Sequence, residues 1–201
     1  MKENPRVCID PGHGGSQPGA VYHDLQEKDV VLKVCNYAKE ELIVLDSKIW
    51  CCLTREFDKT VSLEERCRFA NNTVVDCFIS VHANADPDED YPGMPEAKGE
   101  EIWVYDDSIW GMKLAQCLKD EVDWIFPNEP FRGIKKTRPI GADKKVDRRQ
   151  FLYVISYTDA PAVLVEIGFI DKSSSTETFS NEETLRKIGG LIADGIYKFI
   201  A

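Results

Sequence analysis

Apolar positions along the chain follow two spacings, and their alternation predicts strands separated by helices. Short runs of consecutive apolar residues are typical of buried strands, whereas recurrence at three and four residues is typical of amphipathic helices. The predicted strands are Arg6–Asp10, Lys48–Thr54, Asp76–His82, Glu101–Tyr105, Gly133–Lys136 and Ala162–Ile170. The predicted helices are Glu27–Leu45, Ser62 to Asn71, Ile109–Ile125 and a last one that begins at Ser180 or Asn181, and Phe151–Ile155 is ambiguous between a helical turn and irregular chain.

Strands that alternate with helices imply an α/β fold with a largely parallel or mixed sheet covered on both faces. Ser62 followed by Glu65 forms a capping box that starts the second helix. The polar, proline-rich segment Asn84–Gly99 and the basic segment Thr137–Gln150 predict surface loops. Because no internal repeat or interdomain linker is visible, residues 1–201 are predicted to form a single domain.

Charge and hydropathy narrow the classes of partner. The 201 residues include 25 basic and 35 acidic ones, a formal net charge of −10. This balance argues against a nucleic-acid partner and against adhesion to anionic membranes or polymers. No apolar run approaches the ~20 residues that span a bilayer, which predicts no membrane insertion. No apolar signal core follows Met1–Arg6, so we expect the chain to be synthesised and kept in the cytoplasm until it is released.

The seven cysteines fit a reducing compartment. Their number is odd, no Cys-x-x-Cys pair occurs, and most lie in apolar segments, so we predict free buried thiols. Cys51 and Cys52 are adjacent in a predicted strand and should therefore point to opposite faces of the sheet.

Two of the three histidines follow predicted strands. His13 lies one turn beyond Asp10, and His82 ends its own strand, so both point toward the sheet edge where ligands bind in α/β folds. Glu27 begins the following helix, and His13, Glu27 and His82 form a candidate three-ligand zinc site with an open position. The alternative is that each histidine is a hydrogen-bonded structural residue and that Glu27 is a first-turn acid favoured by the helix dipole. The wide spacing does not decide between them.

Glu166 interrupts the apolar strand Ala162–Ile170. A carboxylate buried there without a partner would cost several kcal/mol, so Glu166 should face a cation, a metal or a water-filled cleft. In a hydrolase it would take the proton of the attacking water and return it to the leaving amine. The structural alternative is a buried ion pair with an arginine such as Arg55.

A set of ordered motifs resembles the type-3 family of zinc-dependent N-acetylmuramoyl-L-alanine amidases. The motifs are Asp10-Pro11-Gly12-His13-Gly14-Gly15, Glu27, Leu53-Thr54-Arg55, Leu63-Glu64-Glu65-Arg66, Ala70-Asn71, Phe78-Ile79-Ser80-Val81-His82-Ala83-Asn84-Ala85, Arg132-Gly133 and Pro161-Ala162-Val163-Leu164-Val165-Glu166-Ile167-Gly168-Phe169. Each motif alone has low specificity for the family, but the ordered set is specific. Together the motifs cover the chain from Val7 to the last helix.

The resemblance implies a twisted mixed sheet of about six strands between helices. It implies one zinc ion per chain held by His13, Glu27 and His82, with Glu166 as the catalytic carboxylate. It also implies a peptidoglycan substrate, in which the amide between N-acetylmuramic acid and L-alanine is hydrolysed. His23 matches no motif position and is interpreted as a surface or rim residue.

Several polar residues near these motifs are candidates for substrate contacts. They are Asn84, Arg132, Lys135, Lys136 and Arg138, the last three at the start of a basic segment. Our hypothesis is that some cations of this basic segment bind the carboxylates of the acidic stem peptide, and the alternative is that the segment is a solvated loop.

The sequence is also compatible with two other functions. One is a zinc peptidase that cleaves within the stem peptide, and the other is a muropeptide-binding module without catalysis. An intact Glu166 favours an enzyme. A chain without a signal peptide resembles phage endolysins, with a sporulation lysin of a spore former as the main alternative. We expect a monomer whose wall-binding domain, where one exists, lies outside residues 1–201.

Overall fold

A six-stranded mixed sheet forms the centre of the computed structural model, which describes residues 3–86, 97–138, 151–171 and 173–201. Its strands are β1 (Arg6–Pro11), β4 (Trp50–Leu53), β5 (Cys77–Asn84), β6 (Glu101–Tyr105), β7 (Ile134–Thr137) and β8 (Ala162–Phe169), in the order β4-β1-β5-β8-β6-β7. All neighbouring pairs are parallel except β6 and β8, which are antiparallel. The predicted α/β class with a mixed sheet is therefore confirmed.

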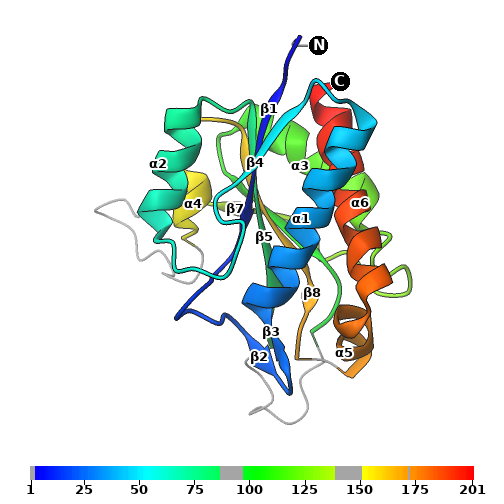
Figure 1. Cartoon of the computed structure of the whole chain (residues 1–201). Coiled ribbons are helices and arrows are strands. Elements are labelled where there is room, and N and C mark those ends of the chain that lie inside the picture. Colours follow the sequence, from blue (N-terminus) through cyan, green and yellow to red (C-terminus); the bar gives the residue numbers. More distant parts are fainter. Residues whose placement is uncertain (1–2, 87–96, 139–150, 172) are drawn as a thin grey trace.

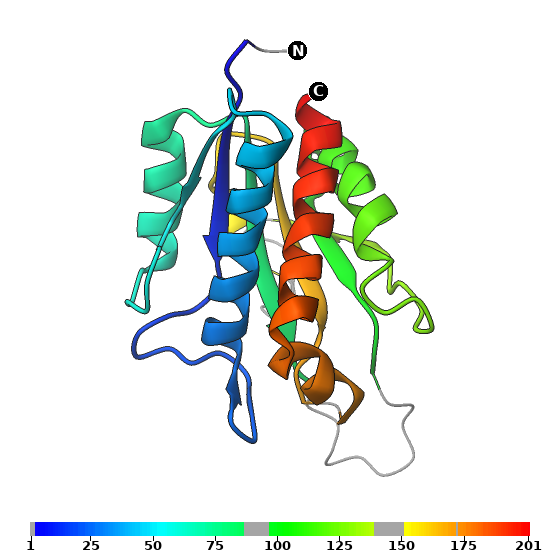
Figure 2. The same cartoon turned by 45° about the vertical axis from the view of Figure 1, so that its right-hand side comes forward.

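Helices cover both faces of the sheet (Figures 1 and 2). One face carries α1 (Glu27–Leu45), α3 (Ile109–Val122) and α6 (Glu182–Ile200), and the other carries α2 (Leu63–Thr73) and α4 (Tyr153–Ser156). The short helix α5 (Ser173–Ser180) packs on α6, and the hairpin of β2 (Val21–Tyr22) and β3 (Leu25–Gln26) precedes α1. Both termini lie at the end of the molecule opposite this hairpin.

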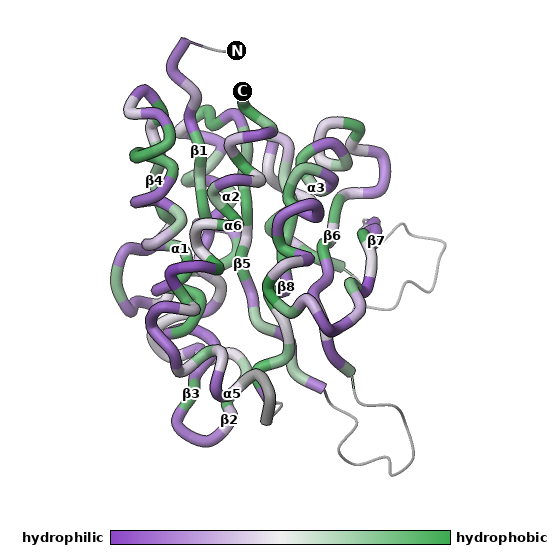
Figure 3. The backbone as a smooth tube through the Cα atoms, turned by 90° about the vertical axis from the view of Figure 1, so that its right-hand side faces the viewer, coloured by the Kyte–Doolittle hydropathy of each residue, from purple (hydrophilic) through white to green (hydrophobic). Residues whose placement is uncertain are grey.

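Two apolar cores follow from the alternation of side chains along the strands. Val7, Ile9 and Ile79 point toward α1 and α6, whereas Cys8 and Phe78, one residue along, point toward α2 and α4. Figure 3 shows the hydrophobic stretches along the central strands and the mostly hydrophilic β2–β3 hairpin. Cys51 and Cys52 divide between the two cores as predicted, and all seven cysteines are free thiols.

Most predicted boundaries agree with the structure to within a few residues. The capping box is present, since Ser62 Oγ accepts the Glu65 N–H at 3.2 Å and Glu65 accepts the Ser62 N–H at 2.8 Å. Asn181 caps α6 by accepting the Thr184 N–H at 3.0 Å. The ambiguous segment Phe151–Ile155 contains the helical turn α4. Sequence patterns missed α5 and the β2–β3 hairpin, both too short or too polar to show periodicity.

The predicted surface loops fall largely outside the described residues, namely 87–96 of the proline-rich loop and 139–150 of the basic loop. Within the part of the chain that the structure describes, no helix combines the length and apolarity needed to cross a bilayer.

Glu100, the residue directly before β6, should make the stability of the fold depend on pH. Burial raises the pKa of its carboxyl to about 7, although Oε1 accepts the Phe126 N–H at 2.8 Å. Because the folded state binds this proton more tightly than the unfolded chain, the stabilisation is complete below pH 4.5 and is lost as the pH rises through 7. Relative to E100Q, the wild type should lose about 2 kcal/mol of unfolding free energy between pH 5 and pH 8.

Urea unfolding of the wild type and E100Q at both pH values measures this difference. E100Q keeps the acceptor for the Phe126 N–H and cannot ionise, so it corrects for every other titrating group. Parallel pH profiles for the two proteins would contradict the assignment to Glu100.

Candidate metal centre and active site

Polar side chains gather where β1, β5 and β8 end, on the face of the sheet covered by α2 and α4. Their positions follow from register, because His82 of β5 pairs with Glu166 of β8, and Glu166 pairs with Glu101 of β6. The three residues therefore form one row across three adjacent strands, on the same face as Phe78, Leu164 and Trp103 of those strands. A cavity of 540 Å³ opens beside this row; its lining includes His13, Gly19, Leu63, His82 and Val154.

The structure brings His13, Glu27 and His82 together. Glu27 Oε2 lies 3.1 Å from His13 Nε2, and Glu27 Oε1 lies 2.8 Å from His82 Nδ1. The two imidazole rings meet edge to face with centroids 4.9 Å apart. One donor atom from each of the three side chains lies within 4.8 Å of the others, so this cluster could hold a metal ion.

Glu27 is the buried centre of this cluster, only 4% exposed. Its Oε2 accepts the Ala20 N–H at 2.8 Å, and its Oε1 accepts the Ala83 N–H at 3.1 Å. Burial opposes ionisation, but the hydrogen bonds and charges of His13 and His82 outweigh it and hold the pKa of Glu27 well below its usual range. The carboxylate is therefore ionised and ready to act as a ligand at neutral pH.

Glycines flank the cluster because the backbone there passes close to the side chains of His82 and Glu27. A Cβ on Gly12 would lie 2.4 Å from His82 Cε1, and a Cβ on Gly19 would lie 2.3 Å from Glu27 Oε2. Neither position leaves room for a side chain. His13 itself adopts a left-handed backbone with φ of 56°, which aims its ring back toward Glu27 and is uncommon for a residue with a Cβ.

Glu166 stands next to His82 in the row and is partly buried. Its Oε2 is buried and has no hydrogen-bond partner among the described residues. Burial, reinforced by the charges of Glu27 and Glu101, raises the pKa of Glu166 well above its usual range, and Lys135 opposes this shift. The sequence offered Arg55 as an alternative ion-pair partner of Glu166. Arg55 instead donates to backbone carbonyl oxygens.

Sequence reasoning missed Glu101, the third member of the row. It is 3% exposed and accepts hydrogen bonds from Arg132 Nε at 2.8 Å, from Lys135 Nζ and from Trp103 Nε1 at 2.9 Å. These partners hold the pKa of Glu101 below its usual range despite burial. The only signal in the sequence was an acidic residue at the start of a predicted strand, and the partners of Glu101 became evident only from the strand register.

The five candidate substrate contacts divide into two groups. Arg132 and Lys135 form ion pairs with Glu101, and the Asn84 amide nitrogen is 3.4 Å from Glu101 Oε1. Lys136 and Arg138 instead pair with Asp106, so they do not join this group. His23 also stays apart, since its ring packs edge to face on Tyr22 at 4.2 Å between centroids.

Known proteins are similar to this chain over nearly its whole length. A family model described as N-acetylmuramoyl-L-alanine amidase matches residues 7–198. An uncharacterized protein of Bacillus subtilis (strain 168), YqiI, is 30% identical over 196 residues, which cover 96% of this chain and 84% of that protein. An endolysin of Bacillus phage SPP1 is 31% identical over 194 residues, which cover 96% of this chain but 65% of the endolysin.

Solved structures share the fold over the whole chain. The crystal structure of an N-acetylmuramoyl-L-alanine amidase from Clostridium difficile 630 superposes with a TM-score of 0.82 at 26% identity and covers 99% of this chain and 98% of its own. Cwp6 from Clostridium difficile superposes with a TM-score of 0.84 at 30% identity, with 98% of this chain covered but only 30% of Cwp6.

Proposed function

The chain belongs to the type-3 N-acetylmuramoyl-L-alanine amidase family, hydrolases of an amide bond in peptidoglycan, and from this premise we propose that His13, Glu27 and His82 bind one zinc ion and that Glu166 is the catalytic carboxylate. The observation that carries the proposal is the position of Glu166 beside His82, one strand from the three-residue cluster. The scissile bond is the amide between the lactyl group of N-acetylmuramic acid and L-alanine.

The donor set suits zinc. Two imidazoles and one carboxylate are the ligand types of catalytic zinc sites, which keep further positions open for water and substrate. Two neutral ligands and one anionic ligand leave the ion with net positive charge. A zinc ion in this cluster would supply Lewis acidity, polarising the scissile carbonyl and lowering the pKa of water.

Glu166 moves the protons in this proposal. Its Oε2, which has no hydrogen-bond partner in the described part of the chain, takes a proton from the water that attacks the lactyl carbonyl. The C–N bond breaks as Glu166 returns this proton to the alanine nitrogen, which leaves as a neutral amine. The second proton of the water stays on the new lactyl carboxyl group and passes to solvent when that group ionises. The products are a muramic acid with a free lactyl carboxylate and a peptide with a new N-terminal alanine.

Digestion of purified peptidoglycan followed by mass analysis of the products tests the reaction. We expect peptides with N-terminal L-alanine and glycan without peptide. Fragments cut within the stem peptide would identify a peptidase instead. Binding of muropeptide without any new amine would identify a binding module.

We also propose that Arg132 and Lys135 bind a carboxylate of the stem peptide. Both side chains are 33% exposed, and Glu101 balances only one of their two charges, which leaves a net cation beside Glu166. Because either variant leaves Glu101 paired with the other cation, R132Q and K135Q should each raise KM for a soluble muramyl peptide about tenfold, at unchanged zinc content.

The matched control is K136Q, which removes the same charge from the neighbouring residue. Lys136 pairs with Asp106 rather than Glu101, so KM should stay within about twofold of the wild-type value. Equal effects of K135Q and K136Q would argue for a general charge effect and against a subsite at Glu101.

We further infer a lytic role at the bacterial cell wall, supported by the likeness to the SPP1 endolysin. In this setting the enzyme acts as a monomer after release from the cell that makes it. Loss of turbidity when purified protein is added to wall preparations is the expected result, and intact walls after prolonged exposure would contradict it.

A further inference from the structure

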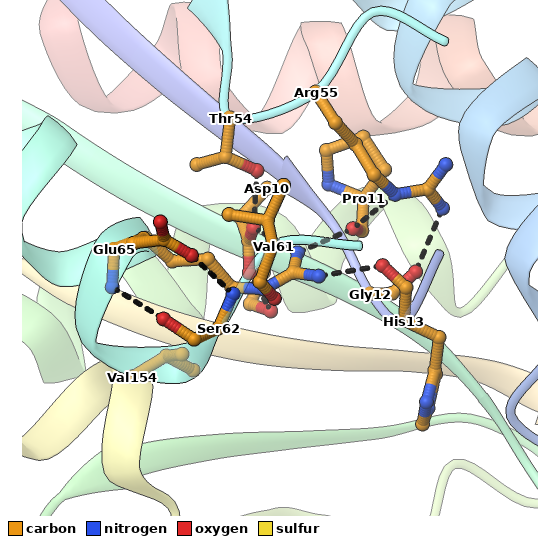
Figure 4. Close-up of polar contacts among 12 residues, drawn as sticks. Asp10, Pro11, Gly12, His13, Thr54, Arg55, Val61, Ser62, Glu65 and Val154 are labelled. Atoms are coloured by element: carbon orange, nitrogen blue, oxygen red, sulfur yellow. Dashed lines mark hydrogen bonds and ion pairs between the residues drawn. The ribbon is translucent and has the colours of Figure 1, made fainter. Parts of the chain in front are cut away.

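Two buried arginines bind the loop that carries His13, and Figure 4 shows the bonds of one of them, Arg55, to Pro11 and Gly12. Arg55 follows β4 and is 1% exposed, and Arg66 comes from α2 and is 2% exposed. A guanidinium is costly to remove from water unless its donors are satisfied. Most of their bonds reach the backbone of one short segment, Pro11 to His13.

Arg66 binds both ends of this segment. Its Nη1 pairs with Asp10 Oδ1 at 2.6 Å and donates to the Pro11 carbonyl at 2.6 Å. Its Nη2 donates to the His13 carbonyl at 2.5 Å, so one guanidinium fixes both ends of the turn. The His13 backbone is left-handed, a conformation that persists only where the surroundings hold it.

Arg55 joins this loop to helix α1. Its Nε donates to the Pro11 carbonyl at 3.0 Å, and its Nη2 donates to the carbonyls of Gly12 and Lys28, each at 2.7 Å. Lys28 directly follows Glu27 in the first turn of α1. A single side chain therefore connects the segment that carries His13 to the segment that carries Glu27.

We propose that Arg55 and Arg66 are positioning residues for the metal centre, an inference that rests on the proposed zinc site. Arg55 sets the separation of His13 and Glu27, and Arg66 maintains the left-handed backbone that aims the His13 ring. In the described residues, their hydrogen bonds to the two ligand-bearing segments all end on backbone carbonyl oxygens, so both arginines act through the backbone. Their effect is to hold two of the three ligands in place before a metal arrives.

Lysine cannot substitute for either arginine. The planar guanidinium presents several donors in a fixed fork. Arg55 and Arg66 each donate to three backbone carbonyl oxygens, and Arg66 also pairs with Asp10. A lysine ammonium keeps the charge but is a compact point charge with a shorter reach. R55K and R66K therefore remove the positioning while preserving the net charge.

The experiment measures zinc affinity of the apoprotein by competition with a chromogenic chelator. We expect R55K and R66K each to weaken zinc binding 10- to 100-fold, the range observed when groups that orient metal ligands are removed. The visible spectrum of the Co²⁺-loaded proteins should change in both variants, because ligand geometry governs its intensity.

A matched control separates positioning from stability. Ser80 Oγ donates to Asp10 Oδ2 at 2.7 Å, in the same buried network but with no bond to the loop carbonyls. S80A should therefore lower the thermal midpoint and leave the zinc Kd within about twofold. R186K, at an exposed ion pair with Glu40, should change neither quantity.

Each outcome decides between explanations. Wild-type zinc affinity in folded R55K and R66K would overturn the inference, and so would equal weakening in S80A. If both lysine variants fail to fold, the arginines are structural and the inference is also overturned. If the wild type itself binds no zinc, it is the proposed function that fails.

Discussion

Replacing Glu166 with alanine or glutamine should lower kcat by about 10²- to 10⁴-fold while the protein retains one zinc ion. The carboxyl lies beside the three-residue cluster without belonging to it, and its Oε2 has no hydrogen-bond partner in the described residues. Its removal therefore eliminates the proton carrier but none of the proposed ligands. Glutamine keeps the shape of the side chain and still cannot accept the proton from water.

Zinc content by atomic absorption and kcat on a soluble muramyl peptide measure the two effects separately. E183Q, an exposed glutamate in α6, is the control for loss of an acidic charge and should behave as the wild type. Near-normal turnover in E166Q would contradict the catalytic role. Loss of zinc in E166Q would instead make Glu166 a ligand.

Replacing Gly12 with alanine should weaken zinc binding by at least about 100-fold, with a matching loss of activity. The added Cβ would lie 2.4 Å from His82 Cε1 and 2.6 Å from Nδ1 and Nε2, all in the ring of a proposed ligand. Gly12 has no left-handed backbone, so the effect comes from the collision alone. His82 must leave its place beside Glu27, or the loop that carries His13 must move away.

The matched control for G12A is the same glycine-to-alanine substitution at Gly190. It lies in α6, and a Cβ there would meet nothing within 4 Å, so G190A should stabilise the fold by about 0.5–1 kcal/mol and leave zinc affinity unchanged. Chelator competition and thermal unfolding on both variants test the pair. Wild-type zinc affinity in G12A would show that the loop relaxes without moving the ligands.

Local patterns were sufficient for most of the fold. Helix α1 was predicted at Glu27–Leu45 and is observed with the same bounds, because its apolar spacing and first-turn acids are properties of neighbouring residues. The Ser62 capping box is likewise local. Helix α5 was missed because serine and threonine have low helix propensity, and the helix forms by packing on α6.

Site residues could be predicted from the sequence only where they lie at or just beyond the end of a predicted strand. His13 follows β1, and His82 lies near the carboxyl end of β5, so their approach at the sheet edge could be expected from the sequence. Glu101 could not be identified in this way, because it begins β6 and faces Glu166 only through the antiparallel pairing of β6 with β8. Lys135 and Lys136 were equivalent in the sequence, yet one pairs with Glu101 and the other with Asp106.

The sequence by itself determined the α/β class, the family resemblance and the three candidate ligands. These depend on residue types and on periodicities of two and 3.6, which are local properties. Only the tertiary structure decided which buried charges meet: Glu101 with Arg132 and Lys135, Asp10 with Arg66, and Arg55 with the carbonyls behind His13. The reason is physical, since partners for buried charges come from strands and helices far apart in the chain, and register and packing, not spacing, bring them within hydrogen-bond distance.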